Sequence, residues 1–284
     1  LMMYFYRTSE KSTEKRTLLY FDKVLDFSYS PDGTRLILSA VKDGITDIYI
    51  HTIASGTNDQ ITRDIADDLN PSFLPDKSDA IIFSSNRQSD TLTNTADPFE
   101  KTALTFDLFT YDVSGRDNIL TRLTEGQYTD RSSPSGIGRN RFAYIGDENG
   151  ILNRYTASFD SAISYIDTTT HYRYFIRSAP ATNYDRNILD HSVVNSTDAF
   201  GEVIFNDNRY LVRKGSLGNS SVDANEIQVT GFRKEKIRLL QKADSIEQLR
   251  QWLIAEDKKR RDTLTKPLWE YYSKDEPIDI THYI

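Results

Sequence analysis

The sequence predicts an all-β fold, a partial β-propeller of four-stranded antiparallel blades, followed by an α-helical C-terminal extension. Three observations predict it. Strand-length segments alternate with tight turns, a unit of four such segments recurs, and helical spacing appears only after about residue 231. Pro31 and Pro75 mark the same point of two successive units and are 44 residues apart. A repeat near this length with four strands per unit is typical of a propeller blade.

The first copy of the repeat covers residues 27–62. Phe27 and Tyr29 alternate with serines, the period of a strand with one buried face. Pro31-Asp32-Gly33 has turn chemistry, because Pro fixes φ, Asp bonds its own backbone and Gly accepts a positive φ. The next strands are predicted at 36–40 and 47–53, and the fourth begins at Gln60-Ile61-Thr62.

Later copies repeat this order less and less closely. The second copy is predicted to have strands at 70–74, 80–85 and 106–111, and Arg122-Leu123-Thr124 matches Gln60-Ile61-Thr62. A polar insertion at 86–105 interrupts it and reads as a long surface loop. The third copy has predicted strands at 132–136, 141–145 and 152–157, and a fourth, more divergent copy runs through 188–213.

These copies define the expected domains. Residues 1–22 are predicted to end a preceding blade, 23–215 to form propeller blades, and 216–284 to form a helical extension and extended tail. Propellers close with about four to eight blades, so the missing blades are expected upstream of Leu1. Leu1 also stands ahead of Met2 and Met3, which suggests a processed piece of a longer protein.

The extension has a helical pattern in two parts. Residues 233–243 form the first, and Ser245 with Gln248 resembles a capping box that starts a second helix. Leu249, Trp252 and Leu253 share one helical face, which is expected to pack against a blade. The basic run 258–261 reads as a solvated helix end, and Pro267 and Pro277 bound the extended tail.

The repeat also resembles a known family. Residues 30–49 read S-P-D-G-x-x-L-I-x-S-x-x-x-D-G-x-x-D-I-Y, which looks like the Pro-Asp (WD40-like) repeat of TolB-like bacterial propellers. The second copy keeps Pro75-Asp76 and the stretch 84–87, and it departs at Lys77, where the family usually has Gly. The third copy has lost Pro-Asp. The resemblance covers about residues 18–175 and implies periplasmic or outer-membrane-associated residence in a bacterium and protein partners of the cell envelope.

Composition excludes several classes of protein. The balance of 35 basic and 42 acidic residues gives a net charge of −7, which disfavours nucleic acid as a partner. The absence of cysteine removes disulfides, thiolate catalysis and Cys-based zinc sites. No apolar run reaches the roughly 18 residues of a transmembrane helix, and no signal peptide is present.

Motifs for catalysis or cofactor binding are missing from the sequence. The histidines at 51, 171, 191 and 282 lie far apart, and no nucleophile elbow, H-E-x-x-H or phosphate-binding loop occurs. No metal or cofactor is expected. The alternative is calcium bound by oxygens of residues 43, 47 and 147–149, but Asp-Gly turns explain most of these.

The predicted function is a non-enzymatic scaffold for protein–protein interaction in the bacterial cell envelope. One alternative is the accessory propeller of a larger peptidase or hydrolase whose catalytic domain lies outside this chain. A lectin-like propeller is a third, if Tyr128 and Tyr144 line an open pocket. Long polar loops on rigid scaffolds often carry recognition, so the predicted partner-binding residues lie on or near the insertion. They are Asn86, Arg87, Asp97, Phe99 and Arg131.

Overall fold

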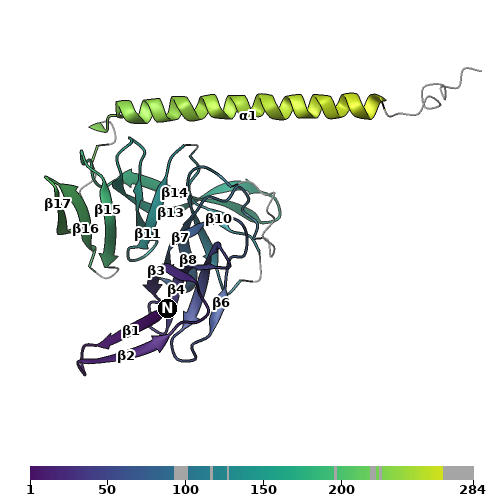
Figure 1. Ribbon diagram of the computed structural model, residues 1–284. Helices are drawn as coiled ribbons and strands as arrows, with labels where there is room; N and C mark the ends of the chain where they lie inside the picture. Colours follow the sequence, from purple (N-terminus) through teal and green to yellow (C-terminus); the bar gives the residue numbers. More distant parts are fainter. Residues whose placement is uncertain are drawn as a thin grey trace, which may run out of the picture. The chain divides into compact units, whose positions relative to one another are not determined.

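A computed structural model gives the arrangement of these segments. The residues it describes are 1–92, 102–115, 118–126, 128–194, 197–217, 222–223 and 226–264. The chain divides into two compact units, Leu1–Arg233 and Lys234–Ile284. The first holds every described strand, and the second holds most of one helix (Figure 1).

The first unit is a series of antiparallel sheets in sequence order. A two-stranded hairpin comes first, with β1 (Met2–Arg7) and β2 (Ser12–Thr17). Blade 1 contains β3 (Lys23–Tyr29), β4 (Arg35–Lys42), β5 (Ile45–Thr52) and β6 (Asn58–Gln60). Blade 2 contains β7 (Asp68–Leu74), β8 (Lys77–Ser85), β9 (Asp107–Asp112) and β10 (Thr121–Arg122).

The later sheets follow the same plan. Blade 3 contains β11 (Arg131–Gly136), β12 (Arg141–Gly146), β13 (Asn153–Ile166) and β14 (Thr170–Pro180). Blade 4 is a three-stranded sheet of β15 (Ile188–Val194), β16 (Ala199–Asn206) and β17 (Arg209–Ser216). In every blade the strands are hydrogen-bonded in chain order. The predicted meander blades are therefore confirmed, and the sheets form an open, partial propeller.

The first strands of successive blades contact one another, so β3, β7, β11 and β15 are the innermost strands. Each of them carries an irregularity in its pairing. In β7 and β11 these irregularities place Asn70 and Ser133 at φ values of 51°. The Asn70 amide nitrogen donates to Asp26 of β3 (3.1 Å), and its oxygen accepts from the Ser133 backbone N–H (3.4 Å). These hydrogen bonds link three successive innermost strands.

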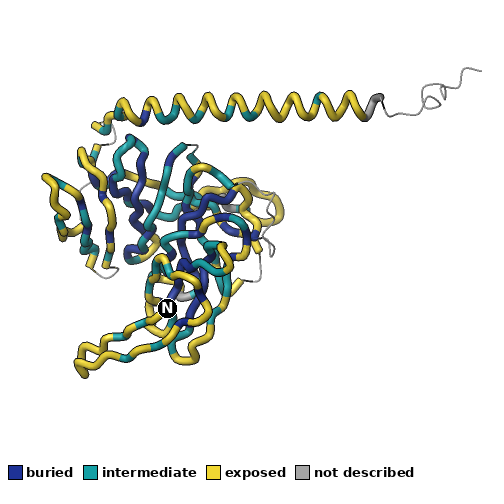
Figure 2. The backbone as a smooth tube through the Cα atoms, viewed as in Figure 1, coloured by how far each residue is buried: buried dark blue, intermediate teal, exposed yellow. Residues whose placement is uncertain are grey.

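Apolar clusters lie between the blades, and the buried residues are concentrated in the blade strands (Figure 2). One cluster joins Ile37, Ile48 and Ile50 of blade 1 to Phe73, Ile81, Phe83 and Phe109 of blade 2. Another joins Ile82 and Leu108 of blade 2 to Phe142, Tyr144 and Tyr155 of blade 3. Alternate residues of a strand face opposite sides, so each blade contributes to the clusters on both of its faces. Aromatic residues such as Phe73, Phe83 and Phe142 are therefore buried between sheets.

Two expectations about the strands are wrong in detail. Phe27 and Tyr29 lie on β3 as predicted but are 56% and 51% exposed, because the two-stranded sheet of β1 and β2 packs on the Leu36 and Tyr49 part of that face and no other described strand covers the two rings. The third copy ends in a hairpin far longer than the repeat predicts, since β13 and β14 extend well beyond the other outer strands.

The helix α1 (Gly231–Leu264) is continuous, which corrects the predicted break at Ser245. The Ser245 hydroxyl donates to the Gln241 carbonyl oxygen four residues earlier (2.8 Å). This hydrogen bond lies within the helix, so Ser245 does not act as an N-cap. Considered by itself, the helix exposes Leu249, Trp252 and Leu253, and their packing against a blade stays a prediction. The predicted extended tail lies outside the described residues.

A search of the described helical residues finds no span with the length and apolar character needed to cross a membrane.

Candidate functional site

One buried hydrogen-bond motif lies at or near the start of the third strand of each four-stranded blade. In blade 1 the Thr62 hydroxyl accepts from the Ile48 backbone N–H (2.9 Å) and donates to the Asp47 carboxylate (3.3 Å). Gln60 donates to the other Asp47 oxygen (2.9 Å). The motif ties the short fourth strand to the third and keeps a carboxylate inside the blade.

The same motif recurs in the next two blades. The Thr124 hydroxyl donates to Asp107 in blade 2 (2.9 Å), and the Thr182 hydroxyl donates to Asn153 in blade 3 (2.9 Å). Each threonine also accepts from the N–H of the residue after its partner, at 2.9 Å. Blade 3 thus replaces the carboxylate with a neutral amide.

Buried ion pairs lie where blades 1 and 2 meet. Arg87, just after β8, donates to Asp64 (3.0 Å) and to both oxygens of Asp68 at the start of β7 (2.7 and 2.6 Å). All three side chains are almost fully buried. Buried charges need such partners, because an isolated ion between sheets would be strongly destabilising.

The junction of blades 2 and 3 repeats this arrangement with reversed charges. Arg131 begins β11 as Asp68 begins β7, and Glu148 lies two residues beyond β12 as Arg87 lies two beyond β8. Arg131 donates to Glu148 (3.2 Å) and to Asp107 (3.0 Å). Both junctions therefore bury a paired charge at the start of the first strand and after the second strand, but the acidic and basic positions are exchanged.

The junction of blades 3 and 4 holds a third buried pair. Arg154 donates to Glu202 (2.7 Å), and both side chains are fully buried. Tyr184 donates to the second Glu202 oxygen (3.1 Å). The His191 ring lies beside Arg154 (Nδ1 to Nε, 3.3 Å) and reaches the Ser133 carbonyl oxygen with Nε2 (2.6 Å), so a neutral ring with the proton on Nε2 satisfies both contacts.

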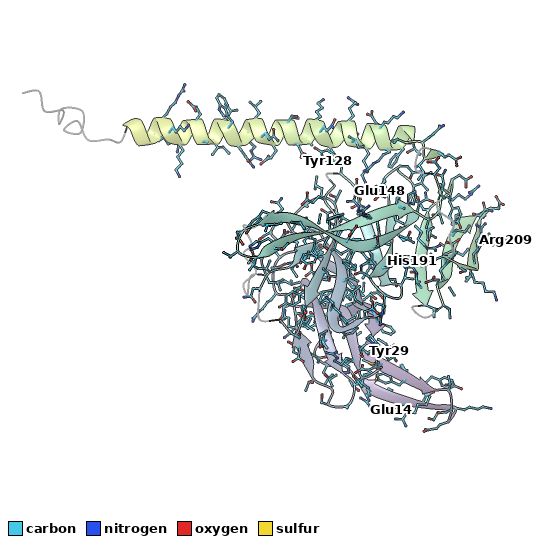
Figure 3. All side chains as sticks on the ribbon, turned by 180° about the vertical axis from the view of Figure 1, so that it is seen from behind. Glu14, Tyr29, Tyr128, Glu148, His191 and Arg209 are labelled. Carbon is cyan, nitrogen blue, oxygen red and sulfur yellow. The ribbon has the colours of Figure 1, made fainter. Side chains whose placement is uncertain are left out.

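Burial shifts the pKa values of several of these groups. Burial, reinforced by the Asp68 and Asp64 carboxylates, raises the pKa of Asp47 to about 7. Burial raises the pKa of Glu148 above its usual range and lowers the pKa of His191 to about 4. Figure 3 labels the positions of Glu148 and His191 on the blade array. These groups lie in packed blade junctions. Structural ion pairs shift pKa values as functional sites do, so burial in the junctions is sufficient to explain these shifts.

Arg233, the last residue of the first unit, places a further buried cation at the junction of blades 2 and 3. Arg233 donates to the Thr129 hydroxyl (2.7 Å) and to Asp147 (3.2 Å), and also to the Tyr128 carbonyl oxygen. Gly150, at a φ of 91°, leaves room for this approach, since a Cβ there would overlap Arg233. Residue 233, predicted only as the start of a helix, is thus a structural anchor.

The residues predicted to bind a partner do not form one exposed surface. Asn86 and Arg87 are buried, and the Asn86 side-chain oxygen accepts from the Asp67 backbone N–H (2.8 Å). The Arg131 guanidinium is mostly buried between two carboxylates. Asp97 and Phe99 lie outside the described residues. The structure gives the first three a role in the blade junctions, and partner binding by this set stays a prediction.

Other side chains singled out in the sequence also have structural roles. Tyr144 is buried, contacts the Ser178 hydroxyl (2.8 Å) and stacks on Tyr155, so it lines no open sugar pocket. His51 contacts Asn58 inside blade 1 (2.8 Å). Among the described residues, no group of three or more Asp, Glu, His or Cys side chains is arranged to hold a metal ion.

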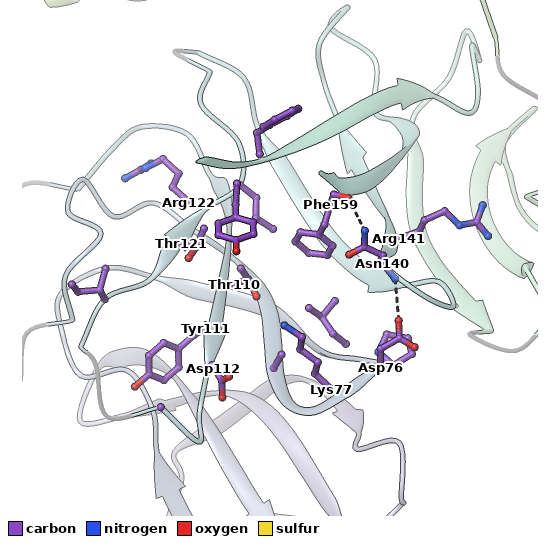
Figure 4. A pocket seen from close by; sticks show the side chains of 18 of the residues that line it. Asp76, Lys77, Thr110, Tyr111, Asp112, Thr121, Arg122, Asn140, Arg141 and Phe159 are labelled. Atoms are coloured by element: carbon purple, nitrogen blue, oxygen red, sulfur yellow. Dashed lines mark hydrogen bonds between the residues drawn. The ribbon is translucent and has the colours of Figure 1, made fainter. Parts of the chain in front are cut away.

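A groove of about 570 Å³ opens between blade 2 and blade 3, where the turn before β12 and the hairpin of β13 and β14 form the blade 3 side (Figure 4). Its size falls in the range of pockets that bind small molecules or short peptide segments. Asn140, at the turn before β12, holds the base together. Its backbone N–H donates to Asp76 (3.0 Å), and its side chain donates to the Phe159 carbonyl oxygen (2.6 Å). The lining is largely apolar and includes Leu74, Pro75, Tyr111, Leu123, Phe159 and Tyr174.

One wall of this groove continues onto an exposed hairpin arm. The pairing of β12 with β13 ends at Ser158, so β13 and β14 go on as a two-stranded ribbon. Phe159, Ile163 and Tyr174 lie on one face of the ribbon, because Ser161 pairs with Tyr174 and alternate residues share a face. Ile163 and Tyr174 are exposed. The outer edge of β14 has no strand partner among the described residues.

Sequence reasoning missed this groove and the arm. The repeat comparison predicts the third strand of this copy only at 152–157 and predicts no fourth strand after it. One signal could have revealed it: Thr182 follows Asn153 at a much greater separation than Thr62 follows Asp47 or Thr124 follows Asp107. The greater length of β13 and β14 themselves explains that difference.

The sheet order, the repeated buried motif and the stacked junctions define the chain as a partial β-propeller of meander blades. Solved structures show that the fold is TolB-like. The chain aligns with TolB from Acinetobacter baumannii at a TM-score of 0.52 and 15% identity, covering 77% of this chain and 47% of that one. It aligns with a structure assigned to TolB from Agrobacterium tumefaciens at 0.53 and 16% identity, covering 72% and 66%.

The remaining comparisons add no family assignment to the fold. A structure assigned to a dipeptidyl aminopeptidase IV from Bacteroides ovatus aligns at a TM-score of 0.46 and 9% identity, covering 77% of this chain and 39% of that one. No family model matches the sequence, and no curated protein matches it. The chain therefore spans about half to two thirds of the length of the TolB structures, and at these identities the likeness establishes the fold.

Proposed function

We propose that this chain is a non-enzymatic propeller scaffold of the bacterial cell envelope, and that it binds an extended segment of a partner protein between blades 2 and 3. The groove carries the proposal. It combines an apolar lining, a size suited to a few residues of peptide, and the adjacent edge of β14, which is unpaired among the strands that the structure describes. Extended peptides bind such edges through main-chain hydrogen bonds, while alternate side chains enter neighbouring pockets.

The buried charges support a scaffold role and not a catalytic one. Asp47, Glu148 and His191, whose pKa values burial shifts toward the neutral form, lie within the blade junctions and are absent from the groove lining. The groove lining includes Asp112, whose pKa is lowered by hydrogen bonds from Ser114. Two cations of the groove lining have carboxylate partners, because Arg122 pairs with Asp107 (3.1 Å) and Arg141 pairs with Asp198 (3.3 Å). Lys77, Asp76 and Asp112 add a few charged side chains to a lining that is otherwise largely apolar, and this combination suits recognition of a polypeptide.

Residence in the periplasm and partners from the envelope are part of the proposal, and the TolB-like fold supports them. The alternative, an accessory propeller of a larger peptidase or hydrolase, stays a prediction. The natural gene would support it if a nucleophile elbow or an H-E-x-x-H helix flanked this segment.

Site-specific photo-crosslinking tests the groove. A photoreactive phenylalanine replaces Tyr174 in cells, and the same residue replaces Tyr210 on β17 as a matched control. The two tyrosines are 73% and 72% exposed, but only Tyr174 lines the groove. Sequencing of the crosslinked peptides should give one recurring partner segment at Tyr174 that is absent at Tyr210.

A second variant connects the crosslink to the groove. Ile119→Lys places a cation in the apolar lining at an exposed position, and it should reduce the Tyr174 crosslink at least tenfold. Identical crosslinking at Tyr174 and Tyr210, or no effect of Ile119→Lys, contradicts the proposal.

A further inference from the structure

The face of blade 1 that points away from blade 2 carries exposed aromatic side chains. Phe27 and Tyr29 form an edge-to-face pair with ring centroids 6.4 Å apart. They pair across the strands with Leu38 and Leu36, which are buried on that same face. Two adjacent aromatic rings at this level of exposure beside a buried cluster mark an interaction surface.

The corresponding face of blade 2 shows what covers such a surface. Phe73 lies on β7, the first strand of blade 2, and is only 2% exposed. It packs against Ile37, Ile48 and Ile50 of blade 1, the preceding blade. Aromatic side chains on the first strand of a blade are thus buried by the blade before it.

The hairpin of β1 and β2 supplies half of such a blade. Met3 and Phe5 of β1 pack against the blade 1 cluster that contains Leu36 and Tyr49, much as Ile48 and Ile50 of β5 pack against blade 2. In position and contacts, β1 and β2 therefore correspond to the two outer strands of a blade. Tyr29 and the hairpin, marked by Glu14, lie at the same end of the blade array (Figure 3).

We infer that the surface formed by Phe27, Tyr29 and the free edge of β1 is the docking face for a β-hairpin of the same polypeptide. This hairpin supplies the two inner strands of the blade whose outer strands are β1 and β2. Its outer strand pairs with the edge of β1 that has no partner among the described residues, and its side chains cover the two aromatic rings. The completed sheet would have four strands, as blades 1, 2 and 3 do.

The repeating contacts favour this occupant over a second copy of the chain. Three successive junctions, from blade 1 to blade 4, join the innermost strand of one blade to that of the next. A hairpin placed inside β1 continues this series on the open side of β3. A two-stranded sheet is also only marginally stable alone, so added strands would stabilise β1 and β2.

Cysteine accessibility tests the inference, because the chain contains no natural cysteine. Tyr29→Cys is introduced both into the 284-residue chain and into the natural gene product, and the rate of maleimide labelling is measured in each folded protein. Ser55→Cys, in an exposed turn, is the accessible control, and Phe73→Cys is the buried control. The 284-residue chain should label Tyr29→Cys within about threefold of Ser55→Cys.

The natural gene product should label Tyr29→Cys at least tenfold more slowly than the 284-residue chain does, with Ser55→Cys unchanged. Deletion of the residues upstream of Met2 should abolish that protection. Equal rates in the two proteins overturn the inference. Protection that persists after the deletion and increases with protein concentration also overturns it, because a second copy is then the occupant.

Discussion

Asn153 of blade 3 stands where Asp47 stands in blade 1. Both residues lie at or near the start of the third strand of their blade. Asn153 accepts a hydrogen bond from the Thr182 hydroxyl (2.9 Å), and Asp47 accepts one from the Thr62 hydroxyl (3.3 Å). The two blades thus place a neutral amide and an ionisable carboxyl in the same buried position. The pKa of Asp47, raised to about 7, makes the difference measurable.

The wild-type protein should lose stability as the pH rises from about 4 to 7, and Asp47→Asn should remove this loss. The folded protein holds the Asp47 proton up to about pH 7, whereas the unfolded chain releases it near 3.8. The unfolded state therefore binds fewer protons in this window, and the wild-type free energy of unfolding falls as pH rises. Each pKa unit corresponds to about 1.4 kcal/mol, so urea unfolding should show the variant gaining on the order of a few kcal/mol relative to wild type from pH 4.5 to 8.

The exposed carboxylate of Asp59 on the neighbouring β6 provides the control for this experiment. Asp59→Asn removes the same charge without removing a buried carboxyl, and its effect on stability should stay within about 0.5 kcal/mol at both pH values. A constant difference between Asp47→Asn and wild type across the window would contradict the prediction.

His191 should produce the opposite pH dependence. Its folded pKa, lowered to about 4 by burial, lies below the unfolded value of 6.5. Between these values the unfolded state binds more protons, so the histidine destabilises the fold as pH falls from about 6.5 to 4. His191→Gln keeps a donor for the Ser133 carbonyl and an acceptor for Arg154, and it should remove an acid-induced loss on the order of 3 kcal/mol.

Comparison of the two variants checks both assignments. In the wild type the Asp47 and His191 effects oppose each other over much of the same window, so they partly cancel. Unfolding titrations of Asp47→Asn should show stability that rises with pH, and those of His191→Gln should show stability that falls with pH. Slopes of the same sign in both variants would refute one of the assignments.

Ser245→Ala distinguishes one helix from two. Inside a continuous helix, Ala is favoured over Ser by about 0.5 kcal/mol, so amide hydrogen exchange around residues 241–250 should slow in the variant. If Ser245 were an N-cap, its loss would cost about 1 kcal/mol and exchange would become faster. Gln251→Ala, an exposed substitution six residues further along the helix, controls for the general effect of adding Ala.

The sequence was sufficient for the blades because their strands and turns are local features. Alternating side chains and the Pro31-Asp32-Gly33 turn predict the strands and their order, and the structure confirms both. The exposure of Phe27 and Tyr29 could not follow from alternation, since burial of a strand face depends on a neighbouring sheet. Ser245 misled for a related reason: the same residue pattern suits a cap or a hydroxyl that bonds back within a helix.

The candidate groove and the junction pairs depend on contacts between distant residues. Arg87 and Arg131 were singled out for their place beside a long loop, but their carboxylate partners come from other strands. Sequence spacing carries no information about which charge is buried against which. The exchange of acidic and basic positions between the two junctions shows that each buried charge needs a partner of opposite sign. It also shows that either position can hold the acid or the base.

That reversal leads to a prediction about the junction of blades 1 and 2. Arg87→Glu alone places three carboxylates together in a buried site, with Asp64 and Asp68 unpaired, and should cost at least the 3–5 kcal/mol typical of a broken buried pair. Adding Asp68→Arg recreates the polarity seen between Arg131 and Glu148. The new arginine would then lie beside Asp47, as Arg131 lies beside Asp107 (3.0 Å).

The double variant should therefore recover a substantial part of the loss, about 2 kcal/mol or more, in a double-mutant cycle followed by thermal unfolding. The exposed pair of Arg7 and Glu14 (3.0 Å) is the matched control, and reversal of its charges should change stability by less than about 1 kcal/mol at every corner of the cycle. If Asp68→Arg fails to rescue Arg87→Glu, the two junctions are not interchangeable, and the polarity of each is fixed by groups beyond the pair itself.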